Sequence, residues 1–231
     1  MKRSTSNRIL TTHAGSLPRP QDLLELIRMK REGDSFDEAK FAARVREAVD
    51  EAVRKQAESG IDIVSDGEMG KPSFIHYVTE RLAGFEGTEP TTPPQNTMSE
   101  DFPGYREWRN QYRNGPTPFS TRPVCVGPLK WKDLGSLKTD IENLKASLSK
   151  VRVEEAFLPC ASVGIVAQRV ANTYYKTYEE YVQAIAECMR EEYRMVADAG
   201  FVVQIDAPEM CIDRNLPEFR DQPIEAFNKR Q

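Results

Sequence analysis

The sequence of 231 residues has no long apolar run, no excess of positive charge and only two histidines. Its apolar stretches are a few residues long, whereas a membrane-spanning helix needs about 20, so we expect no membrane segment. The 32 basic residues are outnumbered by 36 acidic ones and interspersed with them, which argues against a nucleic-acid-binding surface. No apolar stretch follows the basic N-terminus, so we expect no secretory signal and a cytoplasmic location.

Cysteine and histidine are too sparse to form a recognisable metal or redox motif. The four cysteines are Cys125, Cys160, Cys188 and Cys211. No two of them form a Cys-x-x-Cys pair, and we expect buried thiols rather than disulfides. The histidines, His13 and His76, have no partner at ligand spacing and are too few to assign a catalytic triad. Gly-x-Gly-x-x-Gly and Gly-Lys-Ser/Thr sequences are absent, which argues against nicotinamide and nucleoside triphosphate chemistry.

Residues 35–68, which we call the first repeat, predict a helix, a strand and an acidic turn. The segment Ser35 to Glu38 is a capping box, and apolar residues follow at helical spacing as far as Gly60. Residues 61–65 are rich in β-branched side chains, which is typical of a buried strand. This strand runs into a polar turn of sequence Asp-Gly-Glu.

The same pattern returns in residues 177–209, the second repeat. Its first four residues form another capping box, its helix ends at Gly200, and residues 201–205 read as a buried strand. Asp66 and Asp206 each lie six residues after the glycine of their repeat. Repeated helix–strand segments are typical of a parallel α/β protein.

Further strands complete the predicted sheet. They lie at residues 8–12, 122–126 and 154–158, and a helix over residues 137–148 with Ser136 as its cap precedes the last of them. The segment 84–122 is rich in Pro, Gly, Thr and aromatic residues without a sustained period, which predicts a long functional loop. We therefore expect one domain over residues 1–231, with five strands and this loop insertion.

Polar side chains at the ends of these strands are the candidate site residues. In a parallel α/β fold the ligand binds beyond the carboxyl ends of the strands. Ser16, Glu68 and Asp206 would together suit a small substrate with an ammonium group, because a carboxylate forms a charge-assisted hydrogen bond with it. Helix capping is the alternative for Glu68 and Asp206 and is favoured for Asp66. His13 is a strand-end residue that could support the site.

Three motifs resemble those of the cobalamin-independent methionine synthase family. They are residues 11–20, Thr-Thr-His-Ala-Gly-Ser-Leu-Pro-Arg-Pro, residues 60–68, and residues 204–208, where an acidic residue is more usual in the family at Ala207. The resemblance implies a TIM-type (β/α)8 barrel, the fold also used by uroporphyrinogen decarboxylase. It covers the amino-terminal part of the catalytic barrel. Because such barrels typically need about 250 residues, we expect a barrel truncated after about five strands.

The activity implied by the resemblance is methyl transfer from methyltetrahydrofolate to the thiol of homocysteine, a step of methionine biosynthesis. It places Ser16, Glu68 and Asp206 on the amino-acid part of homocysteine, with His13 and Asp66 as candidates for supporting them. A zinc ion binds the thiol as thiolate in the family. Its ligands there are a His-x-Cys pair, a Glu and a distant Cys, which no residues here match. We therefore assign neither metal ligands nor catalytic residues.

Two functions remain open at this point. The chain is part of a zinc-dependent thiol methyltransferase whose remaining strands lie on a longer or separate polypeptide. Alternatively, it is an inactive truncated barrel that binds a small amino acid or thiol, or that self-associates. In both cases a second copy or a partner chain is expected to cover the open sheet edges, because unpaired strand edges invite association.

Overall fold

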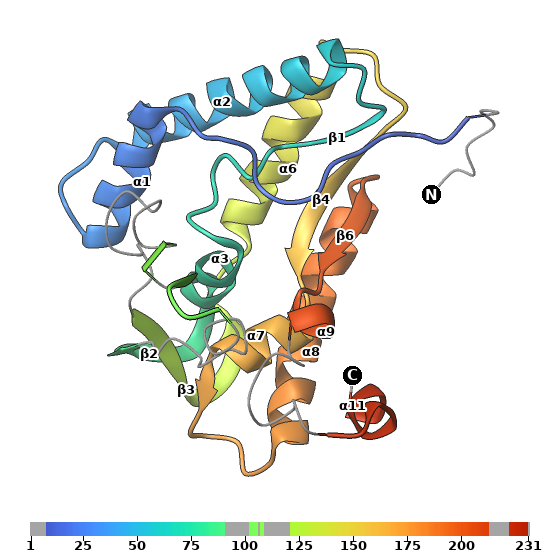
Figure 1. Cartoon of the computed structure of the whole chain (residues 1–231). Helices are drawn as coiled ribbons and strands as arrows, with labels where there is room; N and C mark the ends of the chain where they lie inside the picture. The colour runs from blue at the N-terminus through green and yellow to red at the C-terminus, as the bar shows by residue number, and fades with distance from the viewer. Residues whose placement is uncertain (1–7, 91–101, 106, 109–120, 213–221, 231) are drawn as a thin grey trace. The chain divides into compact units, whose positions relative to one another are not determined.

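A computed structural model describes residues 8–90, 102–105, 107–108, 121–212 and 222–230 (Figure 1). The chain divides into two compact units. The first unit comprises residues 1–82, 131–161 and 186–206, and the second unit comprises residues 83–130, 162–185 and 207–231. This division describes local packing, and the single domain expected over residues 1–231 stays a prediction.

The first unit contains a parallel sheet that sets up the predicted site. Its strands are β1 (Ile63–Ser65), β4 (Glu155–Ala161) and β6 (Val202–Asp206), in the order β1-β4-β6. Ser65 of β1 is paired with Phe157 of β4, which is paired in turn with Val202 of β6. Because all three strands are parallel, their carboxyl ends lie at the same edge of the sheet.

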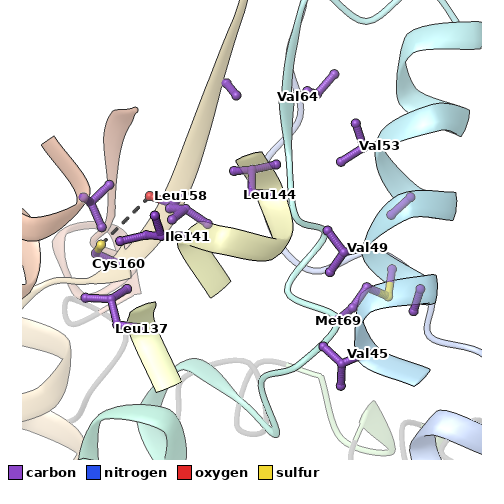
Figure 2. Close-up of a cluster of buried hydrophobic side chains, with 14 of the residues drawn as sticks. Val45, Val49, Val53, Val64, Met69, Leu137, Ile141, Leu144, Leu158 and Cys160 are labelled. Carbon is purple, nitrogen blue, oxygen red and sulfur yellow. Dashed lines mark hydrogen bonds between the residues drawn. The ribbon is translucent and has the colours of Figure 1, made fainter. Parts of the chain in front are cut away.

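Helices of the first unit bury an apolar core against this sheet. They are α1 (Gln21–Glu32), α2 (Glu38–Glu58), α3 (Phe74–Arg81) and α6 (Gly135–Leu148). Helix α8 (Tyr178–Asp198) begins in the second unit and ends in the first. Figure 2 shows the core, in which Val53 of α2, Val64 of β1 and Leu144 of α6 are fully buried. Each such side chain contributes about 1.5–3 kcal/mol relative to exposure.

The second unit has its own small sheet. Strands β2 (Leu82–Pro90), β3 (Thr121–Trp131) and β5 (Ala171–Asn172) lie in the order β2-β3-β5. Its shorter helices are α7 (Val163–Arg169), α9 (Glu209–Ile212) and α11 (Ile224–Arg230). Gly84 has a φ of 90°, and a Cβ built there would lie 2.7 Å from the carbonyl oxygen of Gly127. Only glycine fits this close approach between β2 and β3.

Four of the five predicted strands are confirmed, as β1, β3, β4 and β6. The prediction of a strand at residues 8–12 is wrong. Thr11 meets β1 through one carbonyl oxygen, which accepts from the amides of Asp62 and Ile63, at 3.2 and 3.0 Å, so no ladder forms. Part of the predicted loop at 84–122 is the strand β2, while residues 91–101, 106 and 109–120 lie outside the described residues.

Helix starts were predicted less well than helix ends. Asp37, not Ser35, caps α2 by accepting from the amide of Lys40 at 3.0 Å. Helix α6 has no side-chain cap, so the cap predicted at Ser136 is wrong. The capping hydroxyl of Thr177 is confirmed, because it accepts from the amide of Glu180 at 3.1 Å.

Two simpler expectations concern thiols and membranes. Cys125, Cys160 and Cys188 are free and buried, as predicted, and the side chain of Cys211 lies outside the described residues. Among the described helices, none is both long and apolar enough to cross a bilayer.

Candidate functional site

The acidic turn after β1 is buried and held in an unusual backbone conformation. Asp66 is 2% exposed and Glu68 is 5% exposed. Glu68 has a φ of 57°, in the left-handed region that residues other than glycine rarely occupy and that is found disproportionately at functional sites. Asp66 accepts from the amide of Glu68 at 2.9 Å, so it stabilises the turn itself. The carbonyl oxygen of Glu68 in turn accepts from the guanidinium of Arg19, at 2.8 Å.

Charges of both signs surround this turn. Burial is the main cause that raises the pKa of Glu68, and the negative charges of Asp66 and Asp206 raise it further, whereas Lys71 and Arg19 oppose the shift. Lys71 is 3% exposed, and its ammonium donates to the carbonyl oxygen of Pro159 in β4, at 2.8 Å. Burial would lower the pKa of Lys71, but neighbouring carboxylates, Asp66 first, outweigh it and the pKa is raised.

Asp206 lies at the same edge of the sheet as this turn. It is the last residue of β6, is paired with Ala161 of β4, and is half-buried. Its charge is close enough to contribute to the raised pKa of Glu68. The amide side chain of Gln204 donates to its carboxylate at 2.9 Å. The structure thus brings two of the three predicted ligand residues into electrostatic contact.

Ser16, the third predicted ligand residue, is exposed on the segment that precedes α1. This segment is attached to the acidic turn, because the amide of Leu17 donates to the carbonyl oxygen of Gly67 at 3.1 Å. The hydroxyl of Ser16 is therefore tethered near the turn by its neighbour in sequence. Its predicted contact with a substrate stays a prediction.

His13 belongs to a polar network behind the turn. Its Nε2 lies 2.9 Å from Oε1 of Gln56 and 3.2 Å from the hydroxyl of Ser65. Gln56 also bonds the amide and the carbonyl oxygen of Ser65, at 3.0 and 2.9 Å. The Ser65 hydroxyl accepts from the amide of Gly67 at 3.1 Å, so the network reaches the turn. His13 therefore supports the position of the turn.

Sequence reasoning did not identify Gln56, Lys71 or Arg19 as site residues. Gln56 is a buried polar residue on the otherwise apolar face of α2, which was the available signal. Arg19 lies inside the motif 11–20, and Lys71 follows Glu68 by three residues. Their partners are mainly backbone atoms, which a sequence pattern does not display.

The described residues do not fit the zinc ion that the resemblance implies. Among them, no three His, Cys, Asp or Glu side chains are grouped so that they could hold a metal ion. Burial raises the pKa of the Cys160 thiol far above its ordinary value, which disfavours the thiolate form that zinc prefers. No step proposed below passes through zinc.

Comparisons with known proteins agree with the fold. A family model of the catalytic domain of cobalamin-independent synthases matches residues 9–92. Methionine synthase of Thermococcus kodakarensis is 27% identical over 224 residues, which cover 95% of this chain and 57% of the relative. The Sulfolobus acidocaldarius enzyme is 28% identical over 200 residues, 86% of this chain and 51% of the relative. The chain thus spans about half the length of these curated relatives.

A solved structure shows the same fold. It is a B12-independent methionine synthase from Shewanella in complex with selenomethionine, with a TM-score of 0.58 and 18% identity over 76% of this chain and 45% of that chain. The likeness to this structure shows that the chain has the fold of a TIM-type barrel protein. The predicted resemblance to the amino-terminal part of the catalytic barrel of the cobalamin-independent methionine synthase family is confirmed. Truncation of that barrel stays a prediction.

Proposed function

We propose that this chain supplies the amino-acid-binding edge of a thiol methyltransferase of methionine-synthase type. The substrate would be homocysteine, and the methyl donor would be methyltetrahydrofolate. One observation carries the proposal. Glu68 is a buried carboxylate in a strained backbone conformation, close enough to Asp206 for the two charges to interact.

The proposed roles follow from charge and position. Asp66, Glu68 and Asp206 face only two cations, Arg19 and Lys71. Lys71 also faces the carboxylate of Asp140, so negative charge is in excess and the edge lacks a cation. The ammonium group of an amino acid supplies that cation and accounts for Glu68 and Asp206 as acceptors. The hydroxyl of Ser16 would bond the carboxylate of the same amino acid. These contacts hold and orient the substrate, which is the part of catalysis that we assign to this chain.

Calorimetric titration of the chain with L-homocysteine and with L-methionine tests the proposal. We expect Glu68→Gln to weaken binding of both by tenfold or more, because the amide lacks the charge that meets the ammonium. Glu58→Gln is the matched control, since Glu58 is an exposed residue of α2 paired with Arg54. Equal affinity of wild type and Glu68→Gln would refute the proposed role of Glu68.

Activity separates this proposal from an inactive barrel that only binds amino acids. The chain would be assayed with zinc, methyltetrahydrofolate and homocysteine, with and without the carboxyl-terminal half of a relative such as the Thermococcus enzyme. Methionine formation that disappears in Glu68→Gln would support the methyltransferase. Amino-acid binding without methionine formation in either mixture would support the inactive barrel.

A further inference from the structure

A cavity in the first unit lies among four helices. It has a volume of about 510 Å³ and is bordered by α1, α2, α3 and α6, which are labelled in Figure 1. Ser16, Glu68 and Asp206 do not line it. Its volume is in the range of pockets that bind small organic molecules.

One side of the cavity is apolar. Ile27 of α1 and Phe41, Ala42 and Val45 of α2 form this wall. The opposite side carries hydrogen-bonding groups from α3 and α6, including Tyr77, Thr139 and Asn143. A cavity with one apolar and one polar wall suits a ligand that has an apolar body and a polar end.

Three cations and two carboxylates line the cavity, and one of the cations, Arg81, is paired with Glu192. Lys30, Arg31 and Arg81 line it together with the carboxylate of Glu80. Burial raises the pKa of Glu80, and the charges that oppose the shift are Lys30, Arg31, Lys132 and Arg81. One carboxylate thus faces several cations, and the local potential favours an anion.

The other carboxylate at the cavity, Asp140, is already engaged. Its Oδ2 accepts from the hydroxyl of Tyr77 at 2.5 Å. Burial raises the pKa of Asp140 to about 6, and the nearby ammonium of Lys71 opposes the shift. Asp140 therefore leaves little negative charge to repel an anion in the cavity.

Arg81 lines the cavity and has one guanidinium nitrogen without a hydrogen-bond partner among the described residues. Its Nη2 donates to Glu192 at 2.5 Å, and its guanidinium stacks on the ring of Tyr77, 3.7 Å from the centroid. Its Nη1 is buried and has no hydrogen-bond partner within the described part of the chain. Because this nitrogen is itself buried and the guanidinium is paired with Glu192, Arg81 contributes to the wall of the cavity without offering a donor to a bound molecule.

We propose that this cavity binds a small organic carboxylate, with its apolar body against Phe41 and Ala42 and its anionic group toward Lys30. The inference does not depend on the proposed methyltransferase function, because it uses none of that site's ligand residues. The cavity would make the chain responsive to an aromatic or aliphatic acid other than its substrate.

Protein-observed NMR titration with three probes of one shape tests the charge preference. The probes are benzoate, neutral benzamide and cationic benzylammonium. We expect benzoate to bind at least about tenfold more tightly than either of the others, and to bind more weakly as salt is raised. Perturbed amides should cluster on α1, α2, α3 and α6. Equal binding of the three probes, or perturbations elsewhere only, would overturn the proposal.

Two variants test the position of the site. Ala42→Trp places a large ring at the cavity wall and should abolish benzoate binding, whereas Ala43→Trp, on an exposed neighbouring position outside the cavity, should leave it unchanged. Lys30→Gln should weaken benzoate severalfold with little effect on benzamide. Unchanged benzoate affinity in both Ala42→Trp and Lys30→Gln, with folding verified by the NMR spectrum, would refute the assignment.

Discussion

The two repeats, α2 with β1 and α8 with β6, share one sequence pattern but have different surroundings. Both helices have 21 residues. Each is followed, two residues after its last helical residue, by a glycine with positive φ, 79° at Gly60 and 91° at Gly200, a conformation that glycine adopts without strain. The turn after β1 is buried, whereas Ile205 of β6 is 50% exposed.

Neighbouring segments explain this difference. Strand β1 lies against β4 on one side and meets the segment around Thr11 on the other. Within the described residues, β4 is the only strand paired with β6. The repeated sequence pattern therefore determines the helix, the glycine that follows it and the strand. The burial of the carboxylates depends on the segments that pack against each strand.

Equivalent positions of the repeats, 140 residues apart, also differ in polarity. Gln56 of the first repeat corresponds to Val196 of the second, and Ala52 corresponds to Glu192. Each repeat thus has a buried polar residue where the other is apolar, and the variants below exchange or remove these residues.

The largest effect is expected from Glu192→Leu. Arg81 and Glu192 form an ion pair at 2.5 Å with side chains only 6% and 2% exposed. Removing the carboxylate leaves a buried guanidinium uncompensated, which should lower the free energy of unfolding by about 3–5 kcal/mol. Urea unfolding followed by circular dichroism measures this loss.

The double variant Arg81→Met/Glu192→Leu should recover most of that loss, since apolar residues of similar size often replace buried pairs without penalty. Glu187→Gln is the surface control, because its pair with Arg190 is exposed and should change stability by less than about 1 kcal/mol. A loss at Glu192 no larger than at Glu187 would show that the pair is not buried in solution.

Gln56→Val gives the first repeat the residue of the second. The substitution leaves the amide of Ser65 without its side-chain partner and removes one of the two side-chain partners of the His13 ring. We expect a loss of about 1–3 kcal/mol, the cost of buried groups left unsatisfied, and faster hydrogen exchange at Gly67. Val196→Gln should also destabilise, because it buries an amide in an apolar site. Tolerance of Gln56→Val would mean that the network does not hold the turn.

Much of the fold could be predicted because its signals are local. Apolar residues at helical spacing, ended by a glycine, identify α2 and α8, and the short apolar runs that follow identify β1 and β6. Each of these signals lies within a short stretch of sequence. Helix α1 was missed because only one of its residues, Leu23, is buried, so its apolar face is weak. Residues 8–12 have strand-like composition, but strand formation requires a ladder that only the neighbouring segment can supply.

The site was predictable only in part, for a related reason. Glu68 and Asp206 stand at strand ends, so topology alone indicates that they converge. Lys71 and Arg19 act through the carbonyl oxygens of Pro159 and Glu68. Every residue carries a carbonyl, so the sequence gives no indication of which one a distant cation will reach.

Glu68→Gln and Asp206→Asn compare how removal of a carboxylate charge changes stability in the two acidic turns. Burial raises the pKa of Glu68, so folding opposes its ionisation and the stability of wild type falls as pH rises through that pKa. Glu68→Gln should therefore gain stability relative to wild type as the pH rises above 4.5, the ordinary pKa of a glutamate, by less than the effects above. Thermal unfolding over this range measures the gain. Asp206→Asn, on the half-buried turn, should change the stability less than Glu68→Gln does, because less of its surroundings is removed from water, and an equal change would contradict the comparison.

Ile205→Ser is expected to have the smallest effect. It gives β6 the residue found at the equivalent position of β1, where Ser65 is 1% exposed and fully engaged in the network. Because Ile205 is 50% exposed, its replacement should change the free energy of unfolding by no more than about 0.5 kcal/mol. Ser65→Ile is the reciprocal change and should destabilise strongly. A loss of several kcal/mol in Ile205→Ser that grows with protein concentration would show that a second copy covers β6, because stability then includes the free energy of association.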